Sequence, residues 1–189
     1  MKGSLKSCMK HKKQSALTAF VLVILLMLCG CAGSKSPLEG DWAYNHDPET
    51  VILSLKGDKA VFKGAEYAAA WSDEFLLLTA DNGGTVTLRY ERNKEGVLLY
   101  EPTDYVYDGE GEPEGLVGLW KDAADNWSFE FTENGTFKED GYFPGLYSMQ
   151  ADGTVKLVYN DMFPDTVLYY SLNGSTLRIE YPWQMVSAE

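Results

Sequence analysis

Side chains that could carry catalysis are scarce after residue 31. His46 is the one histidine in that part of the chain, it lies in a polar stretch that reads as a turn, and no cysteine follows Cys31. Nucleophilic catalysis of the Ser-His or Cys-His kind needs a positioned imidazole, and a zinc site of ordinary type needs three or four His, Cys or carboxylate ligands. We therefore expect a protein that is not an enzyme, with no catalytic residue, no metal site and no cofactor.

Carboxylates are the abundant reactive groups, and several gather in the segment 102–114. That segment is rich in proline and glycine and carries Asp104, Asp108, Glu110, Glu112 and Glu114. Paired acids can hydrolyse glycosides, but among 28 Asp and Glu residues such a pair easily arises by chance. The spacing does not match an EF-hand loop, so we interpret the segment as a solvated linker, with a weak calcium site as the alternative.

Aromatic residues are the remaining candidates for binding. One group is expected in the core: Trp42, Trp120, Trp127 and Tyr147. A second group falls near expected turns or the linker, beside proline or glycine, and forms the candidate ligand-binding set: Tyr105, Tyr107, Tyr142, Phe143, Phe163 and Trp183. Aromatic rings held on loops can stack on sugars or grip an apolar ligand. The alternative is that they pack over the open end of a barrel.

The charge is unevenly distributed along the 189 residues. The formal net charge is −12, but residues 1–30 carry five lysines and no acid, which leaves 11 basic and 28 acidic residues, a net of −17, on residues 31–189. A body this acidic repels phosphate, so nucleic acid is excluded as a partner.

The basic start reads as a targeting segment. Residues 1–15 are positive, and residues 16–28 form an unbroken apolar run. Thirteen residues fall short of the roughly 20 that span a bilayer. A basic region, an apolar region and a small-residue exit are typical of a cleaved secretory signal. The alternative is an uncleaved N-terminal anchor helix.

The end of this segment, Leu28-Cys29-Gly30-Cys31, resembles the lipobox of bacterial lipoproteins. The resemblance implies that the signal peptide is cut before Cys31 and that the Cys31 thiol receives a diacylglycerol with acyl chains such as palmitate. Two acyl chains hold a protein firmly on a membrane, whereas one does so only marginally. We expect a protein of the cell envelope, anchored on the extracytoplasmic side through Cys31, with a short tether to residue 37. Whether the source is Gram-positive or Gram-negative stays open.

A repeat organises the rest of the chain. Leu38, Gly40 and Trp42 recur as Leu116, Gly118 and Trp120, and an alternating apolar run and a turn follow each copy. Period two dominates throughout, which predicts an all-β fold with six or seven short strands in each copy, arranged as tandem antiparallel meanders. The two copies could close separately or share one barrel. The predicted organisation is a signal helix at 1–30, a tether at 31–37, modules at 38–101 and 115–182, a linker at 102–114 and a tail at 183–189.

The repeat is similar to the short lipocalin-like domains of unknown function found on bacterial surface lipoproteins. The second copy follows their pattern after Trp120, with Phe129, Phe131, Gly135, Phe137, Gly145 and Tyr147. The first copy departs from the pattern after Trp42. The resemblance implies small lipocalin-like barrels.

Two functions from different classes follow. The first is a non-catalytic module that binds a small apolar or glycan ligand in a barrel mouth, which predicts an internal apolar cavity. The second is a structural or interaction lipoprotein that contacts other envelope proteins through its outer faces, which predicts an exposed apolar patch.

Overall fold

The computed structural model describes residues 35–188 except 123, 125–126 and 161–162. The expected signal helix, the lipobox and Cys31 lie outside the described residues. Among the described residues, no helix is long and apolar enough to cross a membrane.

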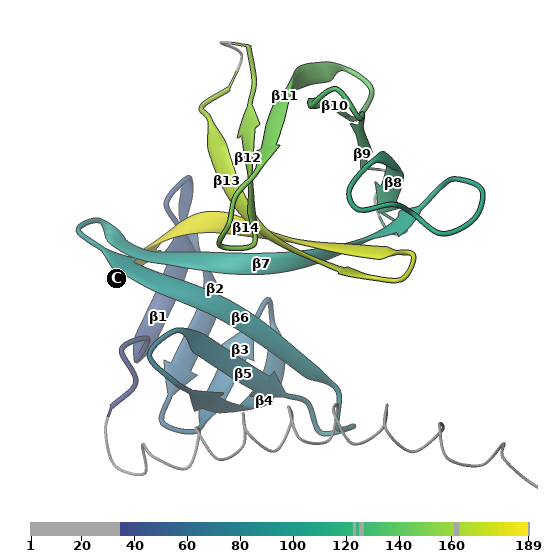
Figure 1. Cartoon of the computed structure of the whole chain (residues 1–189). Helices are drawn as coiled ribbons and strands as arrows, with labels where there is room; N and C mark the ends of the chain where they lie inside the picture. Colours follow the sequence, from purple (N-terminus) through teal and green to yellow (C-terminus); the bar gives the residue numbers. More distant parts are fainter. Residues whose placement is uncertain (1–34, 123, 125–126, 161–162, 189) are drawn as a thin grey trace, which may run out of the picture. The chain divides into compact units, whose positions relative to one another are not determined.

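The described chain is built of β-strands, so the predicted all-β class is confirmed (Figure 1). The strands are β1 Gly40–Tyr44, β2 Asp47–Lys56, β3 Lys59–Phe62, β4 Ala65–Trp71, β5 Phe75–Thr79, β6 Thr85–Asn93, β7 Gly96–Tyr107, β8 Gly118–Asp122, β9 Ser128–Phe131, β10 Thr136–Glu139, β11 Phe143–Met149, β12 Thr154–Val158, β13 Thr166–Asn173 and β14 Thr176–Ser187. Each strand is hydrogen-bonded to the next, β14 returns to β1, and β14 also pairs with β7. The strands thus form one closed ring, and seven fall in each predicted copy.

The chain divides into two units, residues 1–87 with 187–189 and residues 88–186. In the second unit the antiparallel pairing of β7 with β14 closes β7 to β14 into a ring of eight strands. Its buried core is aromatic at the centre, with Trp120, Phe129, Phe131 and Phe137 all nearly inaccessible to solvent. Alternation places these side chains on the inner face because successive strand residues point to opposite faces.

The first unit follows the same principle with smaller side chains. Leu53 and Leu55 on β2 are fully buried, as are Leu76 and Leu78 on β5, whereas their neighbours along each strand are more exposed. At the end of the chain, the backbone amide of Ala188 donates to the carbonyl oxygen of Asp41.

The repeated Leu-x-Gly-x-Trp motif makes the same local structure twice. The indole Nε1 of Trp42 donates to the carbonyl of Leu38 at 2.8 Å, and Trp120 donates to Leu116 at 2.7 Å. The glycine between them has a positive φ in both copies, +123° at Gly40 and +131° at Gly118. Few other residues adopt this conformation without strain, which explains the glycine in the motif.

Two strands run further than the sequence indicates. β7 continues to Tyr107, so the first six residues of the expected linker 102–114 are strand, and β14 continues through residue 187 of the expected tail. Pro102 and Pro182 lie within these strands, where they face Glu180 and Tyr100. The long mutual pairing of β7 and β14 supplies the hydrogen bonds that a free linker or tail would lack.

Candidate functional site

The structure separates the six aromatic candidates into three groups. Tyr105 is not on a loop but within β7, with 2% of its surface exposed, and Tyr107 packs against Trp120 at a ring distance of 5.2 Å. These two are therefore core residues of the second unit. Tyr142, in a turn, is 82% exposed, and Trp183 is partly exposed on β14. Only Phe143 and Phe163 come together at a surface.

Phe143 and Phe163 belong to an aromatic corner at one end of the second unit. Their ring centroids are 5.2 Å apart with the planes at 77°, and Phe163 lies 5.5 Å from Tyr159 at 85°. Phe143 begins β11, and Tyr159 follows β12, so the corner lies at the end where β10 turns into β11 and β12 leads to β13. Phe163 remains 47% exposed, which makes the corner accessible from solvent.

A partly buried glutamate lies beside this corner. Glu139 ends β10 on the inner face, two residues after the buried Phe137, and the Tyr159 hydroxyl donates to its Oε2 at 2.6 Å. The turn that follows has a positive φ at Asp140, +53°. Burial raises the pKa of Glu139 above its ordinary value, although the hydrogen bond from Tyr159 acts in the opposite direction.

Two more tyrosines complete the arrangement. The hydroxyls of Tyr105 and Tyr181 share a hydrogen bond of 2.6 Å. Burial raises the pKa of Tyr105 to about 12, and the carboxylates of Glu139, Asp122 and Asp140 add to the rise. Burial, together with Tyr105 and Glu139, also raises the pKa of Tyr181. We call the six residues the Glu139 cluster: Tyr105, Glu139, Phe143, Tyr159, Phe163 and Tyr181.

The basic side chains of the second unit pair with acids outside the cluster. The ion pairs seen in the second unit lie elsewhere and join Lys121 to Asp108, Lys156 to Asp165, Arg89 to Glu180 and Arg178 to Asp104. In the part of the chain that the structure describes, no basic side chain forms an ion pair with Glu139. A carboxylate taken out of water without a cation is costly, so the cluster is a place where a positive charge is stabilised.

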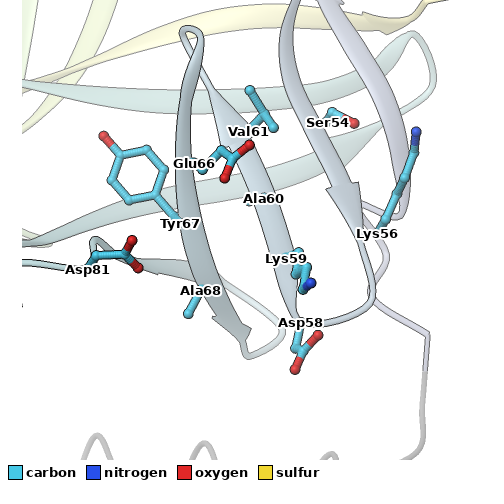
Figure 2. Close-up of a pocket in the computed structure, with 10 residues that line it drawn as sticks. All are labelled: Ser54, Lys56, Asp58, Lys59, Ala60, Val61, Glu66, Tyr67, Ala68 and Asp81. Carbon is cyan, nitrogen blue, oxygen red and sulfur yellow. The ribbon is translucent and has the colours of Figure 1, made fainter.

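The surface pockets have a different character. Figure 2 shows one of about 550 Å³ in the first unit, over β2, β3 and β4. Its side chains mostly occupy exposed strand positions: Ser54 faces Val61, Val61 faces Glu66, and Lys56 faces Lys59. A second of about 350 Å³ lies over β9, β10 and β11. Neither is the internal apolar cavity that a lipocalin-like ligand site predicts.

Within the described ranges, no three His, Cys, Asp or Glu side chains lie close enough to hold a metal ion. The acids of the linker segment do not gather either, since Asp104 is bound by Arg178 with Nε–Oδ1 at 2.7 Å and Asp108 by Lys121. The side-chain hydrogen bond from Arg178 lowers the pKa of Asp104.

Three members of the cluster are not among the candidates that the sequence indicated: Glu139, Tyr159 and Tyr181. The signal for Glu139 was present, because alternation from Phe137 puts residue 139 on the same inner face. Tyr159 and Tyr181 carried no such signal, since an aromatic residue on an inner face is ordinary core. Comparison of the chain with models of protein families, with curated proteins and with solved structures gave no match.

Proposed function

We propose that this protein is a lipid-anchored lipoprotein of the bacterial cell envelope that binds a small ligand at the Glu139 cluster. The lipobox-like Leu28 to Cys31 supports the anchor and its position on the extracytoplasmic side of the membrane. The observation that carries the binding role is the half-exposed Phe163, which packs edge to face against Tyr159, the residue whose hydroxyl donates to Glu139. The chain acts as a binding module and not as an enzyme.

The chemistry of the cluster suits an apolar or glycan ligand. Rings set at nearly right angles offer a face on which an apolar group or a sugar ring packs. The carboxylate of Glu139 and the hydroxyl of Tyr159 offer an acceptor and a donor beside those rings. Few polar groups among aromatic walls are what small-molecule sites use to fix orientation.

The test uses aromatic carbon–proton NMR of the full chain, held in a polyoxyethylene detergent. Chitobiose serves as the glycan probe and 1-hexanol as the apolar probe. We expect at least one of them to shift the Phe143 and Phe163 ring signals, and Phe163→Ala to weaken that binding about tenfold. Leu146→Ala, an exposed position on β11 outside the cluster, is the matched control. Unshifted rings with both probes would contradict an apolar or glycan ligand, and equal losses in the two variants would contradict binding at the cluster.

A second candidate function is a structural lipoprotein that contacts other envelope proteins through its outer faces. It is favoured by Leu146, which is 53% exposed and lies opposite Val158 on β12. Val167 is exposed on the outer side of β13. Under this function Leu146→Ala, and not Phe163→Ala, reduces the protein's chemical cross-linking to other envelope proteins in intact cells.

A further inference from the structure

We propose that the group held at the Glu139 cluster is an organic cation, a primary or quaternary ammonium, with Glu139 as its counter-ion and the rings of Phe143, Tyr159 and Phe163 as its walls. This inference rests on the proposed binding function and names a charged group that the ligand carries.

The groups around Glu139 do not balance its negative charge. Glu139 lies within the electrostatic reach of Tyr105, Tyr159 and Tyr181, and Asp122 and Asp140 also act on the Tyr105 hydroxyl. Each of these neighbours is an acid or a neutral phenol. In the described part of the second unit the basic side chains that form ion pairs do so with other acids. A ligand that brings a positive charge removes the cost of this arrangement.

The rings beside Phe163 lie at steep angles to it. Phe163 is set at 85° to Tyr159 and at 77° to Phe143, so it meets both rings edge to face and stacks on neither. The faces of Phe and Tyr rings attract a cation within about 6 Å of the ring centre. Aromatic walls beside a carboxylate are the arrangement that recognises an ammonium group.

The two copies of the repeat contain the same turn, at Lys63 in the first and at Asp140 in the second. The backbone amide of Lys63 donates to Ile52, and that of Asp140 donates to Ser128, each at 2.8 Å, and both residues have a positive φ near 50°. By this equivalence Phe62 occupies in the first unit the place of Glu139. There the chain supplies its own cation, because Lys63 Nζ lies 5.5 Å from the Phe62 ring centre.

The hairpin does not need a glutamate at the position of Glu139 in order to fold. The hairpin forms with Phe62-Lys63-Gly64 in one copy and with Glu139-Asp140-Gly141 in the other. A buried apolar residue at the place of Glu139 is therefore compatible with the fold. The second copy has a carboxylate, that of Glu139, at the position of the ring. The Asp140 carboxylate, at the position of the lysine, accepts the backbone amide of Ser128 at 3.0 Å, so Glu139 is the acid that remains to receive a cation from outside.

The chemistry also distinguishes an organic cation from a metal ion. Among the residues described, no three acidic or histidine side chains converge as metal ligands. Aromatic rings do not replace the hard oxygen ligands that Ca²⁺ and Mg²⁺ require. An alkylated ammonium is weakly hydrated by comparison and gains from both the rings and the carboxylate.

The test compares choline with 3,3-dimethylbutan-1-ol, its uncharged counterpart of nearly the same shape, by calorimetric titration of the full chain in a polyoxyethylene detergent. We expect choline to bind at least about tenfold more tightly than the alcohol. Glycerophosphocholine, titrated separately, distinguishes the head group of a lipid from a free amine, and binding of either supports the inference. Glu139→Gln keeps the acceptor for Tyr159 and removes the charge, so it should abolish the preference for choline.

Glu130→Gln is the matched control, because Glu130 lies on the outer side of the neighbouring strand β9, opposite Lys138. It should leave both affinities unchanged. Equal binding of choline and the alcohol, or a preference for choline that survives Glu139→Gln, would show that Glu139 does not recognise a positive charge on the ligand. Either result would leave the proposed binding function in place. If choline, the alcohol, chitobiose and 1-hexanol all fail to bind, the proposed function fails as well.

Discussion

Glu139 is a carboxyl group placed where its charged form is disfavoured. It lies on the inner face of β10, where a strand residue is ordinarily apolar, and one phenol hydroxyl satisfies one of its two oxygens. Burial disfavours the charged form of a carboxyl group and so raises its pKa. The stability of the folded protein therefore depends on pH at this position.

This sensitivity gives the first prediction. Since the pKa of Glu139 is raised on folding, the folded state binds more protons than the unfolded state once the pH exceeds about 4.3, the ordinary glutamate value. The stability that Glu139 contributes is complete below that pH and is lost as the pH rises through the raised pKa. Glu139→Gln does not titrate, so its melting temperature relative to wild type should be several degrees higher at pH 7 than at pH 4.

Calorimetry of wild type and variant at both pH values checks this, because all other titrating groups are common to the two proteins. Glu130→Gln, on the outer side of β9, should show a constant offset from wild type. A Glu139→Gln offset that is the same at pH 4 and pH 7, or larger at pH 4, would contradict a raised pKa at Glu139.

The two motif glycines give a second prediction at this scale. A Cβ added at Gly118 would lie 2.4 Å from the ring of Tyr107, whereas one added at Gly40 meets nothing within 4 Å. Both positions have a positive φ, so alanine is strained at each by about 1–3 kcal/mol. Gly118→Ala should lose at least about 1 kcal/mol more than Gly40→Ala in urea unfolding, since Tyr107 must leave Trp120. Equal losses would show that Tyr107 moves aside freely.

Among the elements, β7 and β14 form a symmetric pair. Both are 12 residues long, and they begin at Gly96 and Thr176. Their antiparallel register places the sixth residue of one, Glu101, opposite the sixth of the other, Tyr181, and the four pairs on either side of this centre correspond to one another. Such a register is what two copies of one strand adopt in an isologous contact. The repeat is thus expressed in the pairing of its last strands as well as in its motifs.

A size exchange between β-hairpins gives a third prediction. In the second unit Phe137 faces Gly145, and in the first unit the corresponding cross-strand pair is Ala60 with Tyr67. A Cβ at Gly145 would lie 2.3 Å from the backbone carbonyl oxygen of Val158 and 2.5 Å from the Phe137 ring, so a larger residue there must displace both. Phe137→Ala should cost about 3–5 kcal/mol and Gly145→Tyr about 1–3 kcal/mol or more.

The double variant Phe137→Ala with Gly145→Tyr copies the first unit's pair. Phe137→Ala removes the contact with the ring but leaves the Val158 carbonyl in place, so the double variant should be more stable than the sum of the single changes by only about 1 kcal/mol. Chemical unfolding of the four proteins measures this coupling. Additive losses would mean that the two hairpins pack differently around the pair.

The sequence predicts these elements well where alternation and turns agree. Alternating Phe129, Phe131 and Phe137 around Asn134-Gly135 predicts the hairpin of β9 and β10, and the structure confirms it. The ends of β7 and β14 were missed because Pro102 and Pro182 suggest breaks, while pairing partners distant in sequence hold those residues in strands. The site was half predicted for the same reason. The sequence predicts Phe143 and Phe163 as aromatic residues near turns. Their packing beside Tyr159, whose hydroxyl binds Glu139, depends on contacts between strands that the sequence pattern does not reveal.

At the scale of the whole molecule, charge and anchoring are linked. Residues 31–189 carry a net charge of −17, and an anionic membrane surface repels such a body. Electrostatic attraction therefore does not hold the protein at the membrane. We propose that attachment comes instead from the covalent lipid at Cys31, where two acyl chains suffice.

The last prediction follows from that dependence. Cys31→Ala removes the proposed attachment point, so labelled palmitate should no longer enter the protein, and the chain should accumulate with its signal segment uncut. Cys29→Ala, two residues earlier, is the matched control, since it leaves the thiol at residue 31 in place and should still be labelled and cut. Raised salt should not release the wild-type protein from membranes, because screening weakens ionic contacts and leaves acyl chains in the bilayer. Labelling that persists in Cys31→Ala, or release of wild type by salt, would show that the protein is held in another way.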